Sequence, residues 1–171
     1  MMFKSLKGTD TEKNYKLMVE TAQAFIDDES NVDEPDLVAL LSNLSALINV
    51  YVEDLNWAGF YLVKGNGLVV GPFQGNPACS RIAWGNGVCG KAALEGKSVM
   101  VDDVHKFPGH IACDSASVSE LVIPFFKAGK VFGVLDFDSP LPSRFTALEA
   151  EYLGKIASGL TAFLDNNCKS T

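Results

Sequence analysis

The sequence predicts an α+β fold in which a central antiparallel sheet carries helices over one of its faces. Apolar residues at helical spacing gather near the two ends of the chain, and short apolar strands fill the middle. Tight turns at 64–67 and 127–130 separate neighbouring strands and are typical of hairpins, which require antiparallel pairing. Helices segregated to the ends of such a chain must bury their apolar stripes against the sheet.

Apolar stripes and start signals predict the helices. The first stripe follows residues 9–10, which can cap a helix, and the second follows the acidic linker 33–36. The last helix begins at a capping box formed by Thr146 and Glu149. A short helix is predicted over 88–94.

Alternating or continuous apolar runs predict the strands, which cover 57–63, 68–73, 98–101, 120–126 and 131–137. Pro124 inside one run indicates a sheet edge or a bulge, because proline has no backbone N–H to donate. We expect a single domain over 1–171. Its parts are a leader (1–10), N-terminal helices (11–50), the sheet with its catalytic loops (56–138) and a C-terminal helix (146–165).

Composition excludes several classes of protein. An apolar content of 47% is too high for a disordered chain, and a net charge of −7 disfavours nucleic acids and anionic membranes as partners. The N-terminus lacks the apolar core of a signal peptide, and no apolar run is long enough to span a bilayer. We therefore expect a cytoplasmic protein, in which a disulfide is transient and catalytic rather than structural.

Three of the four cysteines lie beside chain-bending residues, where loops carry function. This placement of Cys79, Cys89 and Cys113 predicts thiol redox chemistry. Cys89 falls near the start of a predicted helix, where the helix dipole lowers a thiol pKa, whereas Asp114 would raise the pKa of a nearby Cys113. Spacing alone does not choose between these two as the nucleophile, and Cys168 is expected to be a tail thiol without a role.

A second candidate feature is a set of carboxylates on an apolar strand. Alternation places Asp136 and Asp138 on one face together with Phe132 and Val134, and Glu120 begins the hairpin partner. Such a cluster can hold an ammonium group, or can contain a carboxyl of raised pKa. The alternative is that Asp138 caps a turn and Asp136 pairs with a lysine.

Aromatic and metal-ligating residues complete the candidates. Trp57 and Tyr61 share one strand face with Gly59 and can form a wall for a small apolar group, or can be ordinary core residues. No Cys-x-x-Cys pair is present, so we expect no metal site, and His105 and His110 are expected to be structural.

Taken in order, these motifs resemble the free methionine-(R)-sulfoxide reductases, a catalytic family of GAF domains. The resemblance covers roughly residues 37–164. It rests on segments that contain all three loop cysteines and all three acids: 71–79, 87–90, 103–105, 109–114, 119–120 and 133–138. It implies an antiparallel sheet with helices on both sides, often in a homodimer.

The resemblance also implies roles for the residues. Cys113 attacks the sulfoxide, Cys79 resolves the resulting sulfenic acid, and Cys89 is an auxiliary thiol. The implied substrate is free methionine-(R)-sulfoxide, and the implied product is methionine. Thioredoxin, or dithiothreitol in vitro, would reduce the final disulfide, and no metal, flavin or nucleotide cofactor is required.

The remaining expectations concern the ligand and the proton. Asp136 and Asp138 suit the substrate ammonium group, Trp57 and Tyr61 suit its methyl group, and Glu120 or Asp138 would protonate the sulfoxide oxygen. Two alternatives remain: a non-catalytic GAF sensor of a small ligand, and a thiol redox sensor in which a Cys79–Cys113 bridge is the signal.

Overall fold

The computed structural model describes residues 8–109 and 113–167, so His110 and Cys168 lie outside the described residues. Four α-helices, one short 3₁₀ helix and six strands occur in this part of the chain. In chain order they are α1 (Thr11–Ser30), α2 (Leu37–Tyr51), β1 (Trp57–Lys64), β2 (Gly67–Gly75), β3 (Arg81–Ala83), α3 (Gly87–Glu95), β4 (Val99–Val101), η1 (Val104–Lys106), β5 (Ser119–Lys127), β6 (Lys130–Ser139) and α4 (Ala147–Asn167).

Helices α1, α2 and α4 start where the sequence predicts, because each has a capping side chain in the right place. Asp10 accepts a hydrogen bond from the Lys13 N–H at 3.1 Å, and Asp36 accepts one from the Ala39 N–H at 2.9 Å. At the start of α4, the Glu149 carboxylate reaches back to the backbone N–H of Thr146 at 2.9 Å.

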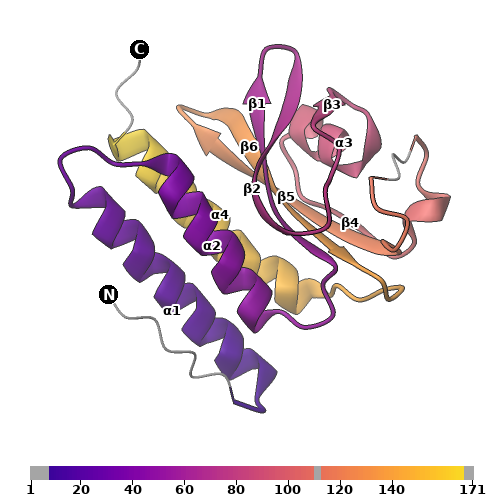
Figure 1. The fold of residues 1–171 in the computed structure, drawn as a ribbon, viewed down its shortest axis with the longest axis horizontal. Helices are drawn as coiled ribbons and strands as arrows, with labels where there is room; N and C mark the ends of the chain where they lie inside the picture. The colour runs from indigo at the N-terminus through magenta and orange to yellow at the C-terminus, as the bar shows by residue number, and fades with distance from the viewer. Residues whose placement is uncertain (1–7, 110–112, 168–171) are drawn as a thin grey trace.

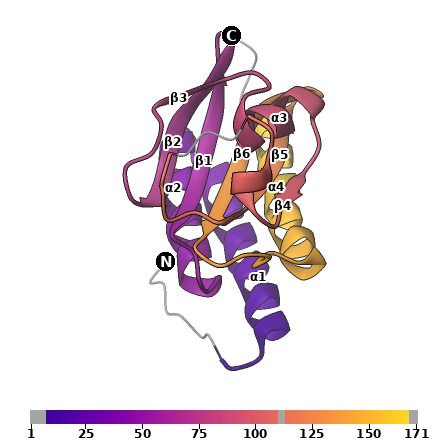
Figure 2. The same ribbon diagram turned by 90° about the vertical axis from the view of Figure 1, so that its right-hand side faces the viewer.

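The six strands form one antiparallel sheet in the order β3-β2-β1-β6-β5-β4. The hairpins β1–β2 and β5–β6 meet where β1 pairs with β6, at the middle of the sheet. Helices α2 and α4 pack on one face, and α1 packs on those two helices as an outer layer (Figure 1). The opposite face carries α3 and the long loops, so helices lie on both sides as expected (Figure 2).

Each face of the sheet has its own apolar core. The larger core lies under α2 and α4 and contains Leu135 and Phe137 of β6, while the smaller core lies under α3 and contains Val134. None of the described helices has both the length and the apolar composition needed to cross a bilayer.

One expectation about β6 is wrong. Phe132 packs with the larger core, on the face opposite Val134, Asp136 and Asp138. The pairing of β6 with β5 jumps from Val131 to Gly133, so Phe132 is the extra residue of a bulge that resets the alternation. Pro124 lies one residue from this bulge. It also lies beyond the part of β5 that pairs with β4, so the structure agrees with both a bulge and a sheet edge at this proline.

Candidate functional site

The candidate site lies between the α3 face of the sheet and the loops above it. Two cross-strand rows form its floor: Trp57, Asp138 and Glu120 lie opposite one another on β1, β6 and β5, and the next row contains Gly59, Asp136 and Val122. The rows bring the three predicted acids together on one face. A pocket over them is lined by Trp57, Tyr61, Cys89, Cys113, Glu120, Asp136 and Asp138, together with the start of α3.

A disulfide closes one side of the pocket. It joins Cys79, in the β2–β3 loop, to Cys113, in the loop that leads into β5, with their Cα atoms 5.3 Å apart. This is the pairing that the resemblance implies. Cys113 lines the pocket directly, whereas Cys79 packs partly buried against the smaller core, and its carbonyl accepts a hydrogen bond from the Tyr61 hydroxyl at 3.0 Å.

The aromatic wall depends on a glycine. The Trp57 ring stacks between those of Tyr61 and Phe73, with centroid distances of 5.7 and 5.1 Å. A Cβ on Gly59 would lie 2.8 Å from the Trp57 ring and 2.3 Å from Phe73 Cβ. Gly59 therefore leaves the space in which the indole lies flat along the strand, at the edge of the pocket.

Glu120 and Asp136 are buried, Asp138 is partly buried beside them, and the loss of solvent raises the pKa of each carboxyl. For Glu120 and Asp138 desolvation is the largest cause and the charge on Asp136 adds to it, so the pKa of each rises well above its ordinary value. Desolvation also raises the pKa of Asp136, to about 6. Hydrogen bonding from Cys89 and Glu120 acts in the opposite direction and keeps Asp136 the most acidic of the three.

The contacts of the two aspartates exclude the alternative in which Asp138 caps a turn and Asp136 pairs with a lysine. Asp136 takes part in none of the ion pairs between described residues, so it is not a lysine partner. The turn after β6 is held by Ser139, whose hydroxyl accepts a hydrogen bond from the Leu141 N–H at 3.1 Å, while Asp138 bonds with Ser117. Both aspartates therefore belong to the pocket.

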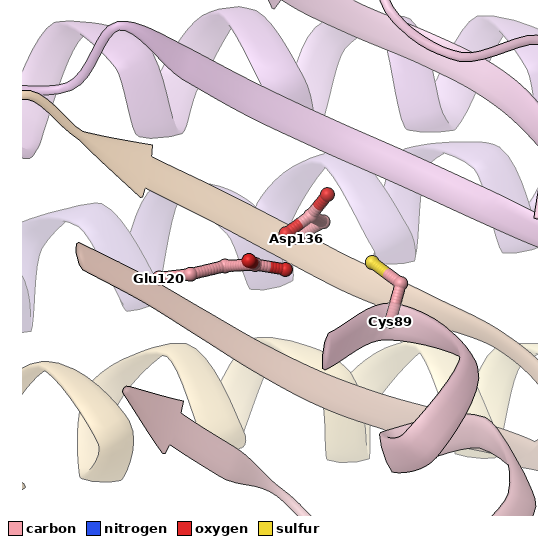
Figure 3. A group of neighbouring side chains, drawn as sticks. All are labelled: Cys89, Glu120 and Asp136. Atoms are coloured by element: carbon pink, nitrogen blue, oxygen red, sulfur yellow. The ribbon is translucent and has the colours of Figure 1, made fainter. Parts of the chain in front are cut away.

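The expectation that Cys89 ionises easily is wrong. Cys89 is the third residue of α3, but its side chain points from that helix toward Asp136 and Glu120 (Figure 3). It is buried, and its sulfur lies within 4.8 Å of a carboxylate oxygen of each acid. Desolvation and these negative charges raise the pKa of the Cys89 thiol well above its usual value, and they outweigh the helix dipole.

Polar atoms without a partner mark the site as a place for a ligand. Within 8–109 and 113–167, three buried side-chain atoms have no hydrogen-bond partner: Asn56 Oδ1, Trp57 Nε1 and Asp136 Oδ1. Two of them belong to residues that line the pocket, and Asn56 precedes Trp57. Such atoms are costly to bury unless something satisfies them. A ligand with both acceptor and donor groups would do so.

The sequence did not predict that three residues near the cysteines are hydrogen-bonded to one another. Asp114, beside Cys113, accepts one hydrogen bond from Asn76, in the loop that carries Cys79, and one from Asn56, which precedes β1. Their positions in turn-forming segments are visible in the sequence, but their contacts join residues up to 58 positions apart, which no local pattern reports.

The chain is similar in sequence and in fold to known proteins. Residues 40–165 match the family model described as "GAF domain". Free methionine-R-sulfoxide reductase of Escherichia coli is 46% identical over 131 residues, which are 77% of this chain and 79% of that protein.

Two solved structures extend the comparison. The free methionine-R-sulfoxide reductase of Neisseria meningitidis, in complex with its substrate, superposes with a TM-score of 0.88 at 38% identity over 96% of each chain. The reduced fRMsr of Staphylococcus aureus gives 0.82 at 43% identity, over 95% of this chain and 99% of that one. Fold and pocket thus define a GAF-domain protein. The chain belongs, more narrowly, to the free methionine-R-sulfoxide reductase family of oxidoreductases.

Proposed function

We propose that this protein reduces the R epimer of free methionine sulfoxide to methionine. The observation that carries the proposal is the position of Cys113, which is paired with a second cysteine and lines the same pocket as the carboxyls of Glu120, Asp136 and Asp138. The relatives that act on this substrate, by their names, match this chain over 77% and 96% of its length.

The pocket suits a free amino acid. Its described lining contains acidic but no basic side chains, which favours the substrate ammonium group near Asp136 and Asp138. No side chain caps the N-terminus of α3, so backbone N–H groups there can bind the substrate carboxylate. Trp57 and Tyr61 enclose the methyl group on the apolar side.

The chemistry is a two-electron reduction of the sulfoxide. The Cys113 thiolate attacks the sulfoxide sulfur, the oxygen takes up a proton, and methionine leaves with Cys113 as a sulfenic acid. The Cys79 thiol then displaces the hydroxyl, which forms the Cys79–Cys113 disulfide and releases water. Each turnover therefore consumes one sulfoxide and two thiol hydrogens.

Glu120 is the best-placed donor of the proton that the sulfoxide oxygen needs. Burial and the facing charge of Asp136 raise its pKa well above the usual range, so it holds a proton at pH values where an exposed glutamate has none. Asp138, which lies directly opposite Glu120, is the second candidate. Asp136 remains ionised beside them and binds the cation.

Recycling needs an external dithiol. Thioredoxin in the cell, or dithiothreitol in vitro, would attack the disulfide and restore both thiols. Cys89 keeps its proton more strongly than an exposed thiol, which favours Cys79 over Cys89 as the resolving residue. The cycle uses no metal or organic cofactor.

The direct test uses cysteine variants and counts methionine. With dithiothreitol and the R epimer, wild type should turn over and Cys113→Ser should release no methionine. Cys79→Ser should release about one equivalent per enzyme and then recycle slowly with thioredoxin, because the sulfenic acid lacks its resolver. Full activity of Cys113→Ser would overturn the assignment.

The same assay separates the enzyme from the sensors. Cys89→Ser is the matched control and should still give methionine in repeated turnovers. Consumption of the S epimer at the same rate would remove the stereochemical part of the proposal. No methionine from either epimer, with all thiols reduced, would favour a non-catalytic ligand sensor or a thiol redox sensor.

A further inference from the structure

Asp114 connects the two loops that carry the paired cysteines. Its Oδ2 atom accepts a hydrogen bond from Asn76 Nδ2 at 3.2 Å and another from Asn56 Nδ2 at 3.2 Å. Its Oδ1 atom accepts from the backbone N–H of Ala116 at 2.9 Å. Asp114 adjoins Cys113, and Asn76 precedes Cys79 by three residues, so these bonds run beside the disulfide.

The two asparagines fix Asp114 to different parts of the scaffold. Asn76 directly follows β2, in the loop that carries Cys79, while Asn56 leads into β1 and donates its backbone N–H to the carbonyl of Asp138 at 3.0 Å. Asn56 Nδ2 also donates to the Ser117 hydroxyl at 2.9 Å, farther along the loop that carries Cys113. The hydrogen bonds that Asp114 accepts from Ala116, Asn76 and Asn56 favour the charged form of its carboxylate and lower its pKa.

We propose that Asp114 is a positioning residue for the thiol–disulfide step, in which it holds Cys113 beside Cys79 through Asn76 and Asn56. The inference rests on the proposed catalytic cycle. After methionine leaves, the sulfenic acid on Cys113 must meet the Cys79 thiol, and the rate and equilibrium of bond formation depend on how often the two sulfurs meet. A link between the loops that persists without the disulfide raises the effective concentration of one thiol near the other.

A purely local role for Asp114 is the alternative, and the chain contains a control for it. Asp103 also accepts a hydrogen bond from a backbone N–H two residues ahead, that of His105, at 3.1 Å. Its carboxylate also forms an ion pair with Lys106, on the same short turn, at 2.9 Å. Asp103→Asn therefore tests the loss of a turn-capping carboxylate in the same long connection, without the link to Asn76.

The test measures the stability of the disulfide without any sulfoxide. The protein is equilibrated with mixtures of reduced and oxidised glutathione, in which two glutathione thiols reduce the Cys79–Cys113 bond and yield one glutathione disulfide. The samples are quenched by alkylation, and the paired peptides are quantified by mass spectrometry. Failure of the reductase activity would leave this measurement intact, so the two proposals fail separately.

Asn76→Ala removes the donor from the Cys79 loop and leaves Asp114 and its turn in place. We expect the equilibrium constant for disulfide formation to fall three- to tenfold, which makes the potential less negative by about 15–30 mV. Asp103→Asn should stay within about 5 mV of wild type. An unchanged potential in Asn76→Ala, or an equal shift in Asp103→Asn, would overturn the proposal.

A charge exchange gives the second test. Asn76→Asp places two carboxylates against each other and should shift the potential further than Asn76→Ala does. The double variant Asn76→Asp with Asp114→Asn restores a donor facing an acceptor. Asn56 can adapt to it by rotating its amide, because its Oδ1 atom has no partner. We expect the double variant to recover at least half of the shift, and no recovery would show that the link does not position the cysteines.

Discussion

Two aspartates of the site show how surroundings set the behaviour of one residue type. Asp114 is partly exposed and accepts three hydrogen bonds, so its pKa falls, whereas Asp136 is buried beside other acids and its pKa rises to about 6. The same burial keeps the Cys89 thiol protonated. The protein thus stores an electrostatic cost in the pocket, which a bound cation would relieve.

This cost predicts that Asp136→Asn stabilises the protein without ligand. The folded pKa of about 6 lies above the ordinary aspartate value of 3.8, so between these values the folded state holds a proton that the unfolded state has lost. Stability therefore falls as the pH rises through this window. The two-unit difference corresponds to at most about 3 kcal/mol above pH 6.

Urea unfolding at pH 8 and pH 4 measures the effect. We expect Asp136→Asn to unfold with a free energy about 1–3 kcal/mol higher than wild type at pH 8, and nearly equal to it at pH 4. Glu20→Gln, which removes an exposed carboxylate of α1, should change neither value. A gain of the same size at both pH values would show that the cause is packing and not charge.

At the level of elements, the sequence predicts what local chemistry decides. Helix boundaries follow from Asp10, Asp36 and the Thr146–Glu149 pair, whose hydrogen bonds lie within one turn. The short strand β3 was not predicted, because it has three residues of which Ile82 alone is buried. The bulge at Phe132 was missed for another reason: it exists only in the pairing with β5.

Site prediction divides in the same way. The acids Asp136 and Asp138 could be predicted to share a face because strand alternation is local, and Glu120 because a hairpin brings it opposite them. The raised pKa of Cys89 could not be predicted, because the sequence shows that a helix starts near it but not that two carboxylates face it from other elements. Local pattern thus gives the members of the site, and packing gives their protonation.

The aromatic wall on β1 supports a prediction at this scale. Gly59→Ala would bring a methyl group into contact with Phe73 and the Trp57 ring, so the indole must leave its place. We expect a loss of about 2–4 kcal/mol in stability and weaker substrate binding, measured by urea unfolding and by the Michaelis constant.

The matched control is Gly154→Ala on α4, where an added Cβ meets nothing within 4 Å. It should stabilise the protein by about 0.5–1 kcal/mol, because alanine is a better helix former than glycine. If Gly59→Ala kept both its stability and its Michaelis constant, the place of the Trp57 ring would not depend on a glycine at position 59.

For the whole molecule, the layered arrangement separates stability from chemistry. The larger core lies under α2 and α4, while the reactive groups lie on the other face beneath α3 and the loops (Figure 1). The α3 face can therefore carry buried acids and a reversible disulfide while the larger core supplies most of the packing. The homodimer that the family resemblance implies stays a prediction, which the molar mass from light scattering would test.

The disulfide links two loops across this face, so its state should affect the whole fold. The bond joins residues 34 positions apart, and the chain-entropy estimate for such a loop is about 3–4 kcal/mol. The hydrogen bonds of Asp114 restrict the same loops in the folded state only. They therefore do not reduce the entropy that the disulfide removes from the unfolded chain. We expect the oxidised protein to be about 2–4 kcal/mol more stable than the reduced one, with a melting temperature about 5–15 °C higher.

Calorimetry with and without reductant gives the measurement, and the cysteine variants identify its cause. Cys89→Ser should keep the difference, because Cys89 is the free cysteine of the described chain and lies outside the bond. Cys79→Ser should lose it and melt at the temperature of the reduced wild type. If reductant lowered the melting temperature of Cys79→Ser as well, the stabilisation would come from another oxidation. If oxidised and reduced wild type melted together, the bond would restrict the native state as much as the unfolded chain, and the predicted stabilisation would be wrong.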